Sequence, residues 1–238
     1  MIDVALSPAE ISQLKEGDLQ EMTVVVFDVL RATSSMITGL AHGVASFFPV
    51  QTVEAAREWK EREPDRLLAG ERYGVPPPGF DLGNSPSEFK NVRDQQIIIT
   101  TTNGTAALEQ VRSAKTVLVG ALVNIAALAE FIRSSSPEHL LLVCAGTGDR
   151  FSLEDAVGAG ALLASLKRTD YLDAASMVHS LFSQVHDDLE TCLCHSQNGR
   201  ALLALGKAND VRDCGRLSVY ETVGIMRGQA VVSVRMTV

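Results

Sequence analysis

The sequence contains few cysteines, no basic block and no long hydrophobic run, and each absence excludes a class of protein. Its 238 residues include four cysteines, at 144, 192, 194 and 214, which are too few and too clustered for a disulfide framework. The first residues lack a basic segment followed by an apolar one, and no apolar stretch reaches transmembrane length. A net charge of -8 without a basic block argues against a nucleic-acid partner. We therefore expect a cytoplasmic protein that uses neither a membrane nor a nucleic acid.

Short apolar runs alternate along the chain with helical patterns, which favours right-handed crossovers and a sheet with helices on both faces. The expected strands are continuous apolar runs, as in buried parallel sheets; they span 23–28, 45–50, 67–70, 97–100, 116–120 and 140–144. The expected helices span 33–43, 53–62, 105–112, 124–134 and 153–167. The predicted fold class is therefore α/β, a layered α/β/α sheet with mostly parallel central strands. We expect a single domain over 1–238, in which two lobes with the site between them remain an alternative.

Three segments depart from this alternation. Residues 71–95 hold four of the eight prolines and are expected to form a long irregular loop, which in a compact domain is more often functional than a plain connector. The tail "AVVSVRMTV" (230–238) alternates and is expected to add an edge strand. Residues 171–206 are expected to be helical, with one apolar face formed by Met177, Leu181, Val185 and Leu189.

Three expected strands run directly into loops of small, hydroxyl or charged residues, and each loop runs into a helix. They are "VVVFDVLRATSS" (24–35), "IIITTTNGTAAL" (97–108) and "LLLVCAGTGDRFSLEDA" (140–156). Ligands of open α/β sheets bind beyond the carboxyl ends of the strands, where helix N-termini offer free N–H groups that suit an anion. The loops contain neither a P-loop nor a GxGxxG motif, so ATP and dinucleotides are not indicated. Close approach of the backbone to a ligand would be permitted by Gly104, Gly146 and Gly148.

Several polar residues of these loops also have a plainer explanation. Asp28 could cap the turn after its strand, and Arg31 could be the ion-pair partner of Asp28. Thr102, Asn103 and Thr105 could simply cap the helix that follows them. Taken singly, none of these residues identifies a binding site.

The acidic residues, too, have a plainer explanation when taken singly, but they add to the case for a site when all the loops are taken together. Glu154 and Asp155 lie in the first turn of an expected helix, where the helix dipole alone favours negative charge. The 71–95 loop supplies further polar residues, namely Glu71, Arg72, Asp81 and Asn84. Three anion-binding loops and one polar loop together favour a site for a small anionic ligand.

The second half of the chain contains two groups of residues that could bind a metal. Cysteines 192, 194 and 214 could form a zinc site with His195, but a C-x-C-H run is not the usual paired C-x-x-C spacing. His186 and Glu190 could form a second metal pair, whereas a solvated amphipathic helix is the more favoured explanation of both residues.

Four segments resemble, in order and spacing, the 2-phosphosulfolactate phosphatases: "DVLRATSS", "GERYGVPPPGFDLGNSPSEF", "TTNGTAAL" and "CAGTGDRFSLEDAVGAG". The resemblance runs from the N-terminal residues to the C-terminus and includes "LLALGKANDVRDC". It implies an α/β/α fold and a magnesium-dependent acid phosphatase. That enzyme removes phosphate from (2R)-O-phospho-3-sulfolactate and gives sulfolactate in a route to coenzyme M. Fold and reaction type are implied more directly than the pathway.

The spacing from Cys144 to Arg150 is that of phosphatases that attack phosphorus with a thiolate. Phe151, however, takes the place of the hydroxyl residue that usually follows the Arg, and no histidine precedes the Cys. Cys144 also ends an apolar strand, where cysteine often behaves as a small hydrophobic residue. A cysteine-dependent phosphatase is therefore the alternative, and not the favoured mechanism.

Metal-assisted hydrolysis fits the family resemblance better than a thiolate or an aspartyl-phosphate mechanism does. An aspartyl-phosphate mechanism of the haloacid-dehalogenase type needs a second Asp two residues after Asp28, and position 30 is Leu. Mg²⁺ prefers carboxylate oxygens and waters, and it binds through few protein ligands together with substrate phosphate. Carboxylates on separate loops are available for it.

We therefore expect an enzyme that hydrolyses a phosphomonoester of a small anionic hydroxy acid, with Mg²⁺ as cofactor and a homodimer as its assembly. A non-enzymatic anion-binding regulatory module remains the competing class. The expected catalytic residues are Asp28, Glu71 and Asp155, and the expected metal ligands are Asp28, Glu71, Asp81 and Glu154. The expected substrate contacts are Arg31, Arg72, Asn84, Ser85, Thr102, Asn103, Gly104, Thr105 and Gly146.

Overall fold

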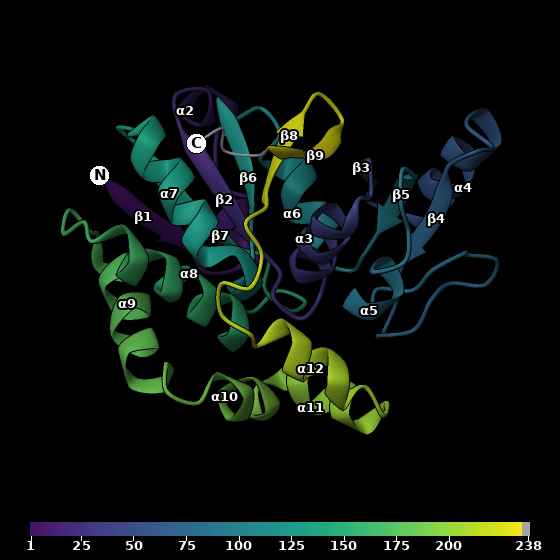
Figure 1. The fold of residues 1–238 in the computed structure, drawn as a ribbon. Helices are drawn as coiled ribbons and strands as arrows, with labels where there is room; N and C mark the ends of the chain where they lie inside the picture. Colours follow the sequence, from purple (N-terminus) through teal and green to yellow (C-terminus); the bar gives the residue numbers. More distant parts are fainter. Residues whose placement is uncertain (235–238) are drawn as a thin grey trace.

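Nine strands form one hydrogen-bonded sheet in the computed structural model of the protein, which describes residues 1–234 (Figure 1). All six expected strands are present. In their spatial order the strands are β1 (Ile2–Ala5), β7 (Leu140–Cys144), β2 (Thr23–Phe27), β6 (Thr116–Gly120), β8 (Val223–Arg227), β9 (Ala230–Val234), β3 (Ser46–Pro49), β5 (Gln96–Thr100) and β4 (Leu67–Gly70).

The sheet consists of two parallel groups joined by an antiparallel hairpin. Strands β1, β7, β2 and β6 pair in parallel, and so do β3, β5 and β4. The hairpin β8–β9 lies between the groups, with β8 antiparallel to β6 and β9 antiparallel to β3 through the pair Phe47 and Val231. The predicted strand is present as Ala230–Val234, but its predicted place at the edge was wrong, because β9 lies inside the sheet. Residues 235–238 of that prediction lie outside the described residues.

The five expected helices agree with the structure to within one or two residues. The structure adds short helices and a helical C-terminal region. The helices are α1 (Pro8–Ile11), α2 (Glu16–Leu19), α3 (Ala32–His42), α4 (Val53–Arg62), α5 (Pro86–Phe89), α6 (Gly104–Gln110), η1 (Leu122–Asn124), α7 (Ile125–Ser135), α8 (Leu153–Leu166), α9 (Asp173–Val185), α10 (Leu189–His195), α11 (Gln197–Ala204) and α12 (Ala208–Cys214). Among residues 1–234, no helix is long and apolar enough to cross a membrane.

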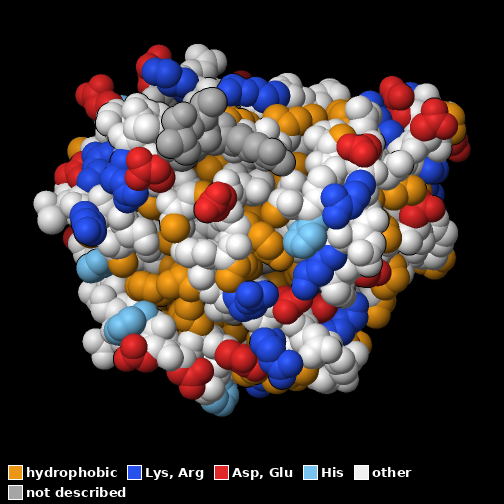
Figure 2. Space-filling model, in the orientation of Figure 1, with side chains coloured by type: hydrophobic (Ala, Val, Ile, Leu, Met, Phe, Trp, Pro, Cys, Tyr) orange, Lys and Arg blue, Asp and Glu red, His pale blue; other side chains and the backbone are white. Residues whose placement is uncertain are grey.

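Alternate side chains of each buried strand enter two different cores. Val25 and Phe27 of β2 pack with α7, α8 and α9 on one face, whereas Val24 and Val26 pack with α3 and α6 on the other. This follows from the two-residue repeat of a strand, whose successive side chains point to opposite faces. The layered α/β/α fold is confirmed. Figure 2 shows acidic and basic side chains interspersed over one face, with no continuous basic area among the described residues seen there.

The apolar face of α9 differs from the expected one. Met177 is 53% exposed, whereas Leu181 and Val185 pack against the core as expected, and Val178 and Phe182 are buried beside them. Gly160 of α8 allows this close packing, because a Cβ there would lie 2.1 Å from the carbonyl oxygen of Val178. The helix also ends at Val185, so Leu189 belongs to α10.

Helices α10, α11 and α12 lie beyond the carboxyl ends of β2 and β7 (Figure 1). We call residues 189–214, which contain these three helices, the helical cap. The segment between β4 and α5 is irregular, as expected, and it touches the cap: Gly74 lies against Leu205, and the Ser85 hydroxyl donates to Asp210. Both segments therefore reach the end of the sheet at which a ligand site was predicted.

Candidate active site

A cavity of about 390 Å³ lies between the strand-end loops and the helical cap. Loops that follow β2, β4, β5 and β7 form one side of it, and α11 with the turn after it forms the other. Both parallel groups of the sheet thus contribute to one site. Its lining residues are Asp28, Leu30, Arg31, Glu71, Tyr73, Gly74, Asn84, Thr102, Asn103, Thr147, Gly148, Asn198, Ala201, Leu202 and Leu205.

Asp28 is the buried carboxyl group of this cavity. It follows β2 directly, is 8% exposed and accepts a hydrogen bond on Oδ1 from the backbone N–H of Ala32 at 3.3 Å. Gly104 passes close to it, since a Cβ at this position would lie 2.5 Å from Asp28 Oδ2. Burial, with Glu71 and then Glu154 as like charges, raises the pKa of Asp28 to about 7. The side chain therefore lies in an excess of negative charge.

Glu71 and Glu154 approach Asp28 from separate loops. Glu71, after β4, accepts hydrogen bonds from the N–H of Gly74 at 2.8 Å and from the N–H and hydroxyl of Thr102 at 2.9 and 3.0 Å. Glu154, in the first turn of α8, is 1% exposed and accepts from Asn198 Nδ2 at 2.6 Å. We call Asp28, Glu71 and Glu154 the acidic floor: Asp28 and Glu71 line the cavity, whereas Glu154 is buried behind the lining, where its charge still acts on Asp28.

Asp155 has a different environment from its neighbour Glu154. Its Oδ1 accepts from the N–H of Val29 at 2.8 Å, and its Oδ2 accepts from the N–H of Gly146 at 3.0 Å. Burial, with Asp28 as the nearest like charge, raises the pKa of Asp155 well above its usual value. Asp155 is not among the cavity-lining residues, and both its oxygens bind backbone. The side chain joins the loops after β2 and β7, and the N–H of Gly146, an expected substrate contact, donates to it.

The β5 loop contributes Thr102 and Asn103 to the cavity wall. Asn103 precedes α6 without capping it through its side chain, so its amide is not used as a helix cap. Thr105 behaves otherwise: its hydroxyl donates to the carbonyl of Thr101 at 3.0 Å and accepts from the N–H of Thr101. The first two residues can meet a ligand, whereas Thr105 stabilises the loop.

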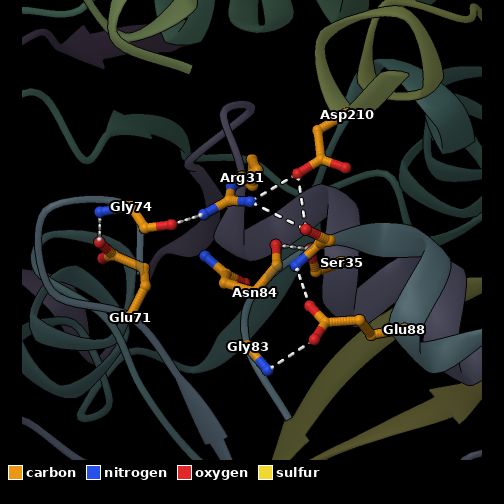
Figure 3. A network of polar contacts seen from close by, with 9 residues as sticks. Arg31, Ser35, Glu71, Gly74, Gly83, Asn84, Glu88 and Asp210 are labelled. Atoms are coloured by element: carbon orange, nitrogen blue, oxygen red, sulfur yellow. Dashed lines mark hydrogen bonds and ion pairs between the residues drawn. The ribbon is translucent and has the colours of Figure 1, made fainter. Parts of the chain in front are cut away.

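Arg31 is buried at the edge of the cavity and pairs with the helical cap rather than with Asp28 (Figure 3). Its guanidinium donates to Asp210 at 2.5 Å, to the Ser85 hydroxyl at 3.1 Å and to the Gly74 carbonyl at 3.0 Å. The Ser85 hydroxyl also donates to Asp210 at 2.7 Å. Asn84 lines the cavity and is 2% exposed, and its Oδ1 has no hydrogen-bond partner among the described residues.

Arg72 and Asp81, both expected in the site, also lie outside the cavity lining. The Arg72 guanidinium donates to the carbonyls of Glu71 and Gln51 and to the Thr100 hydroxyl, and it is absent from the cavity lining formed by residues 1–234. Asp81 accepts from the N–H of Leu68 at 2.8 Å, and its side chain is 42% exposed. The 71–95 loop is a wall of the site through Glu71, Gly74 and Asn84 instead.

A family model described as 2-phosphosulpholactate phosphatase matches residues 8–229. The chain belongs to this family. A relative from Thermotoga petrophila, named "Probable 2-phosphosulfolactate phosphatase", is 39% identical over 225 residues, which cover 94% of each chain.

Two further relatives in the family carry the same printed name. The protein from Carboxydothermus hydrogenoformans is 35% identical over 223 residues, covering 93% of this chain and 91% of the relative. The protein from Deinococcus radiodurans is 39% identical over 204 residues, covering 84% and 85%. The family match spans the acidic floor and the helical cap together, so the cavity as a whole lies within the family's shared region.

The thiolate alternative within this family finds little support in the geometry. Cys144 is fully buried, and burial, followed by the charge of Asp155, raises the pKa of its thiol well above the usual value. The following loop does not wrap an anion, because the N–H groups of Thr147 and Arg150 donate to each other's carbonyls at 2.8 and 3.2 Å. A thiolate nucleophile needs a lowered thiol pKa and a loop whose N–H groups are free to bind the phosphate.

Sequence reasoning missed the residues that the helical cap contributes. Asn198 and Asp210 lie on helices and not in a loop that follows an apolar strand, and Leu202 and Leu205 resemble ordinary apolar helix positions. The segment "LLALGKANDVRDC", which the family shares, contains Leu202, Leu205 and Asp210. The sequence signal for these residues was that segment itself, which begins within the last turn of α11.

Proposed function

We propose that the protein is a magnesium-dependent phosphatase that hydrolyses 2-phosphosulfolactate to 3-sulfolactate and phosphate. The observation that carries the proposal is the acidic floor, in which two carboxylates line the cavity and a third, Glu154, lies behind them and acts on Asp28, in a chain of this family. The relatives' names supply the substrate. In the proposal, as in the family resemblance, the product enters a coenzyme M type pathway.

The donor set of the acidic floor fits Mg²⁺. Among residues 1–234, no three His, Cys, Asp or Glu side chains come together as a complete metal-binding group. Mg²⁺ does not require one, because it binds through one or two carboxylates and takes its other ligands from water and substrate phosphate. Asp28 would hold the ion, with Glu71 or Glu154 bound directly or through water.

The charge balance of the cavity also favours a cation. The charged residues in its lining are two carboxylates, Asp28 and Glu71, and one guanidinium, Arg31, which is already paired with Asp210. A phosphorylated sulfolactate carries several negative charges, so these residues alone would repel it. When bound, Mg²⁺ would neutralise phosphate charge and polarise the phosphoryl oxygens.

The other cavity residues would bind and orient the substrate. The side chains of Thr102, Asn103 and Asn84 offer hydroxyl and amide groups to its anionic oxygens. Leu202 and Leu205 of the cap form an apolar wall, which limits the water around the ester. Glu71 orders this side of the site by holding both the 71–74 turn and Thr102.

Phosphate release from 2-phosphosulfolactate tests the reaction and the metal together. We expect activity to vanish after treatment with EDTA and to return with Mg²⁺. Phosphorylated hydroxy acids without a sulfonate serve as the comparison panel. Full activity in a metal-free preparation would contradict the metal requirement, and absence of release at any Mg²⁺ concentration would contradict the reaction.

Replacement of the buried thiol separates the two chemistries. Cys144→Ser should retain activity within about tenfold, a barrier change of about 1.4 kcal/mol, because the thiol packs in the core. Mass spectrometry of the quenched reaction provides the second measurement. A phosphorylated Cys144 would show that sulfur is the nucleophile.

A further inference from the structure

Asn198 is the point at which the helical cap reaches the acidic floor. It is the second residue of α11 and lines the cavity. The start of α11 is held firmly, because the Ser196 hydroxyl accepts from the N–H of Gly199 at 3.0 Å. Gly199 itself packs tightly, since a Cβ there would lie 1.8 Å from the carbonyl oxygen of Leu193. The backbone from which the Asn198 side chain projects is therefore held in place.

The amide of Asn198 bridges the turn after β7 and the first turn of α8. Its Nδ2 donates to Thr147 Oγ1 at 2.7 Å and to Glu154 Oε1 at 2.6 Å. An amide NH₂ group has two hydrogens, so these two bonds use its full donor capacity. The bond to Glu154 is charge-assisted, which makes it stronger than a bond between neutral groups.

Glu154 depends on this neutral amide because no cation is paired with it within residues 1–234. The carboxylate is 1% exposed, and it takes part in none of the ion pairs formed by those residues. A buried carboxylate without a partner would turn or become protonated. Asn198 binds one oxygen, Oε1, and so sets the direction in which the other oxygen points.

We propose that Asn198 is a positioning residue, which orients Glu154 and the 147–150 turn so that the acidic floor binds its divalent cation. This inference rests on the proposed function. Groups that hydrogen-bond a metal-binding carboxylate typically contribute about 10- to 100-fold to metal affinity. The cap thereby contributes to cation binding without supplying a ligand.

Magnesium binding by the full-length protein tests this role. Isothermal titration with MgCl₂ should show affinity reduced roughly tenfold in Asn198→Ala. The Mg²⁺ concentration for half-maximal activity should rise by the same factor, while kcat at saturating Mg²⁺ stays within about threefold. Asn209→Ala is the matched control, because Asn209 is also the second residue of a cap helix but is exposed. It should bind Mg²⁺ like the wild type.

A double-mutant cycle with Glu154→Gln identifies the path of the effect. If Asn198 acts through Glu154, Asn198→Ala should cause no further loss of Mg²⁺ affinity in the Glu154→Gln protein. Wild-type affinity in Asn198→Ala, or fully additive losses, would overturn the role of Asn198 and leave the proposed function standing. A wild-type protein that binds no Mg²⁺ would overturn both. If Asn198→Ala does not fold, Asn198→Ser, which keeps one donor, should give an intermediate affinity.

Discussion

The strand-end loops and the helical cap form opposite walls of one cavity, but they carry different chemistry. The loops supply the acidic floor, whose three carboxylates take part in no ion pair within residues 1–234. The cap supplies leucines and the neutral amide of Asn198, and its buried acid, Asp210, is neutralised by Arg31. The unpaired carboxylates thus lie on loops that are fixed by the parallel strands, whereas the short helices of the cap close the cavity.

The two walls also differ in how they are held. The loops follow strands that are hydrogen-bonded within the sheet. The cap is held by apolar side chains in the core, such as Leu193 and Val211, and by polar bonds, chiefly Arg31–Asp210 at 2.5 Å, Lys90–Asp213 at 2.8 Å and the Asn198 bridge. Changes in the floor should therefore act mainly on chemistry, and changes in the cap, apart from Asn198, mainly on stability.

The largest effect is expected on the floor, from Asp28→Asn. The change removes the buried carboxylate that would hold the cation, so kcat/KM should fall on the order of 10³-fold, or about 4 kcal/mol. Steady-state phosphate release at saturating Mg²⁺ measures it. Asp18→Asn, on an exposed helix, is the control and should have no effect. Activity within tenfold of the wild type would place the chemistry elsewhere.

The same substitution should stabilise the metal-free protein. The pKa of Asp28 is raised from 3.8 to about 7, so the folded state holds this proton more tightly than the unfolded state. The associated stability is present below about pH 4 and is lost as the pH rises through about 7. The neutral amide of the variant has no such loss, so above about pH 7 in EDTA it should melt roughly 5 °C higher, for about 2 kcal/mol. A lower melting temperature would contradict the raised pKa.

An intermediate effect is expected in the cap, from Asp210→Ala. The change leaves the buried Arg31 guanidinium without its charge partner and should reduce stability by about 3 kcal/mol. The melting temperature should fall by roughly 10 °C. Asp213→Ala on the same helix breaks the partly exposed pair with Lys90 and should cost less than about 1 kcal/mol. Equal losses in the two variants would contradict the difference between these pairs.

The smallest effect is expected from Arg72→Lys. A substrate-gripping Arg72, as expected from the sequence, would lose about thirtyfold in kcat/KM on this change. Because the guanidinium binds Thr100 and backbone carbonyls outside the cavity, we now expect a loss within about threefold. Kinetics on the folded variant decide between the two values. Asp81→Asn should likewise resemble the wild type.

The floor could be predicted from the sequence because its signals are local. Buried apolar runs marked the strands, and Asp28, Glu71 and Glu154 each lie in the loop or first helical turn after such a run. The cap could not be predicted in this way. Glu154 and Asn198 are 44 residues apart, and Arg31 and Asp210 are 179 residues apart, so no local pattern connects them.

The position of β9 and the direction of Arg72 were also predicted wrongly, because both depend on contacts between distant parts of the chain. The alternation at 230–234 predicted a strand, but its neighbours, β8 and β3, are chosen by packing across the whole sheet. For Arg72, the residue type suggested an anion contact, whereas the direction of the side chain depends on Thr100 and Gln51. Sequence patterns identify elements and residue types, and tertiary contacts decide where each side chain points.

The internal position of the β8–β9 hairpin has a consequence for biosynthesis. A ribosome completes both parallel groups before it releases the hairpin that joins them. Until then β6 and β3 each present an unpaired edge, which is a template for pairing with another chain. Within residues 1–234, β8 and β9 are the strands that cover these two edges, so a nascent chain that still lacks them is expected to be prone to aggregation.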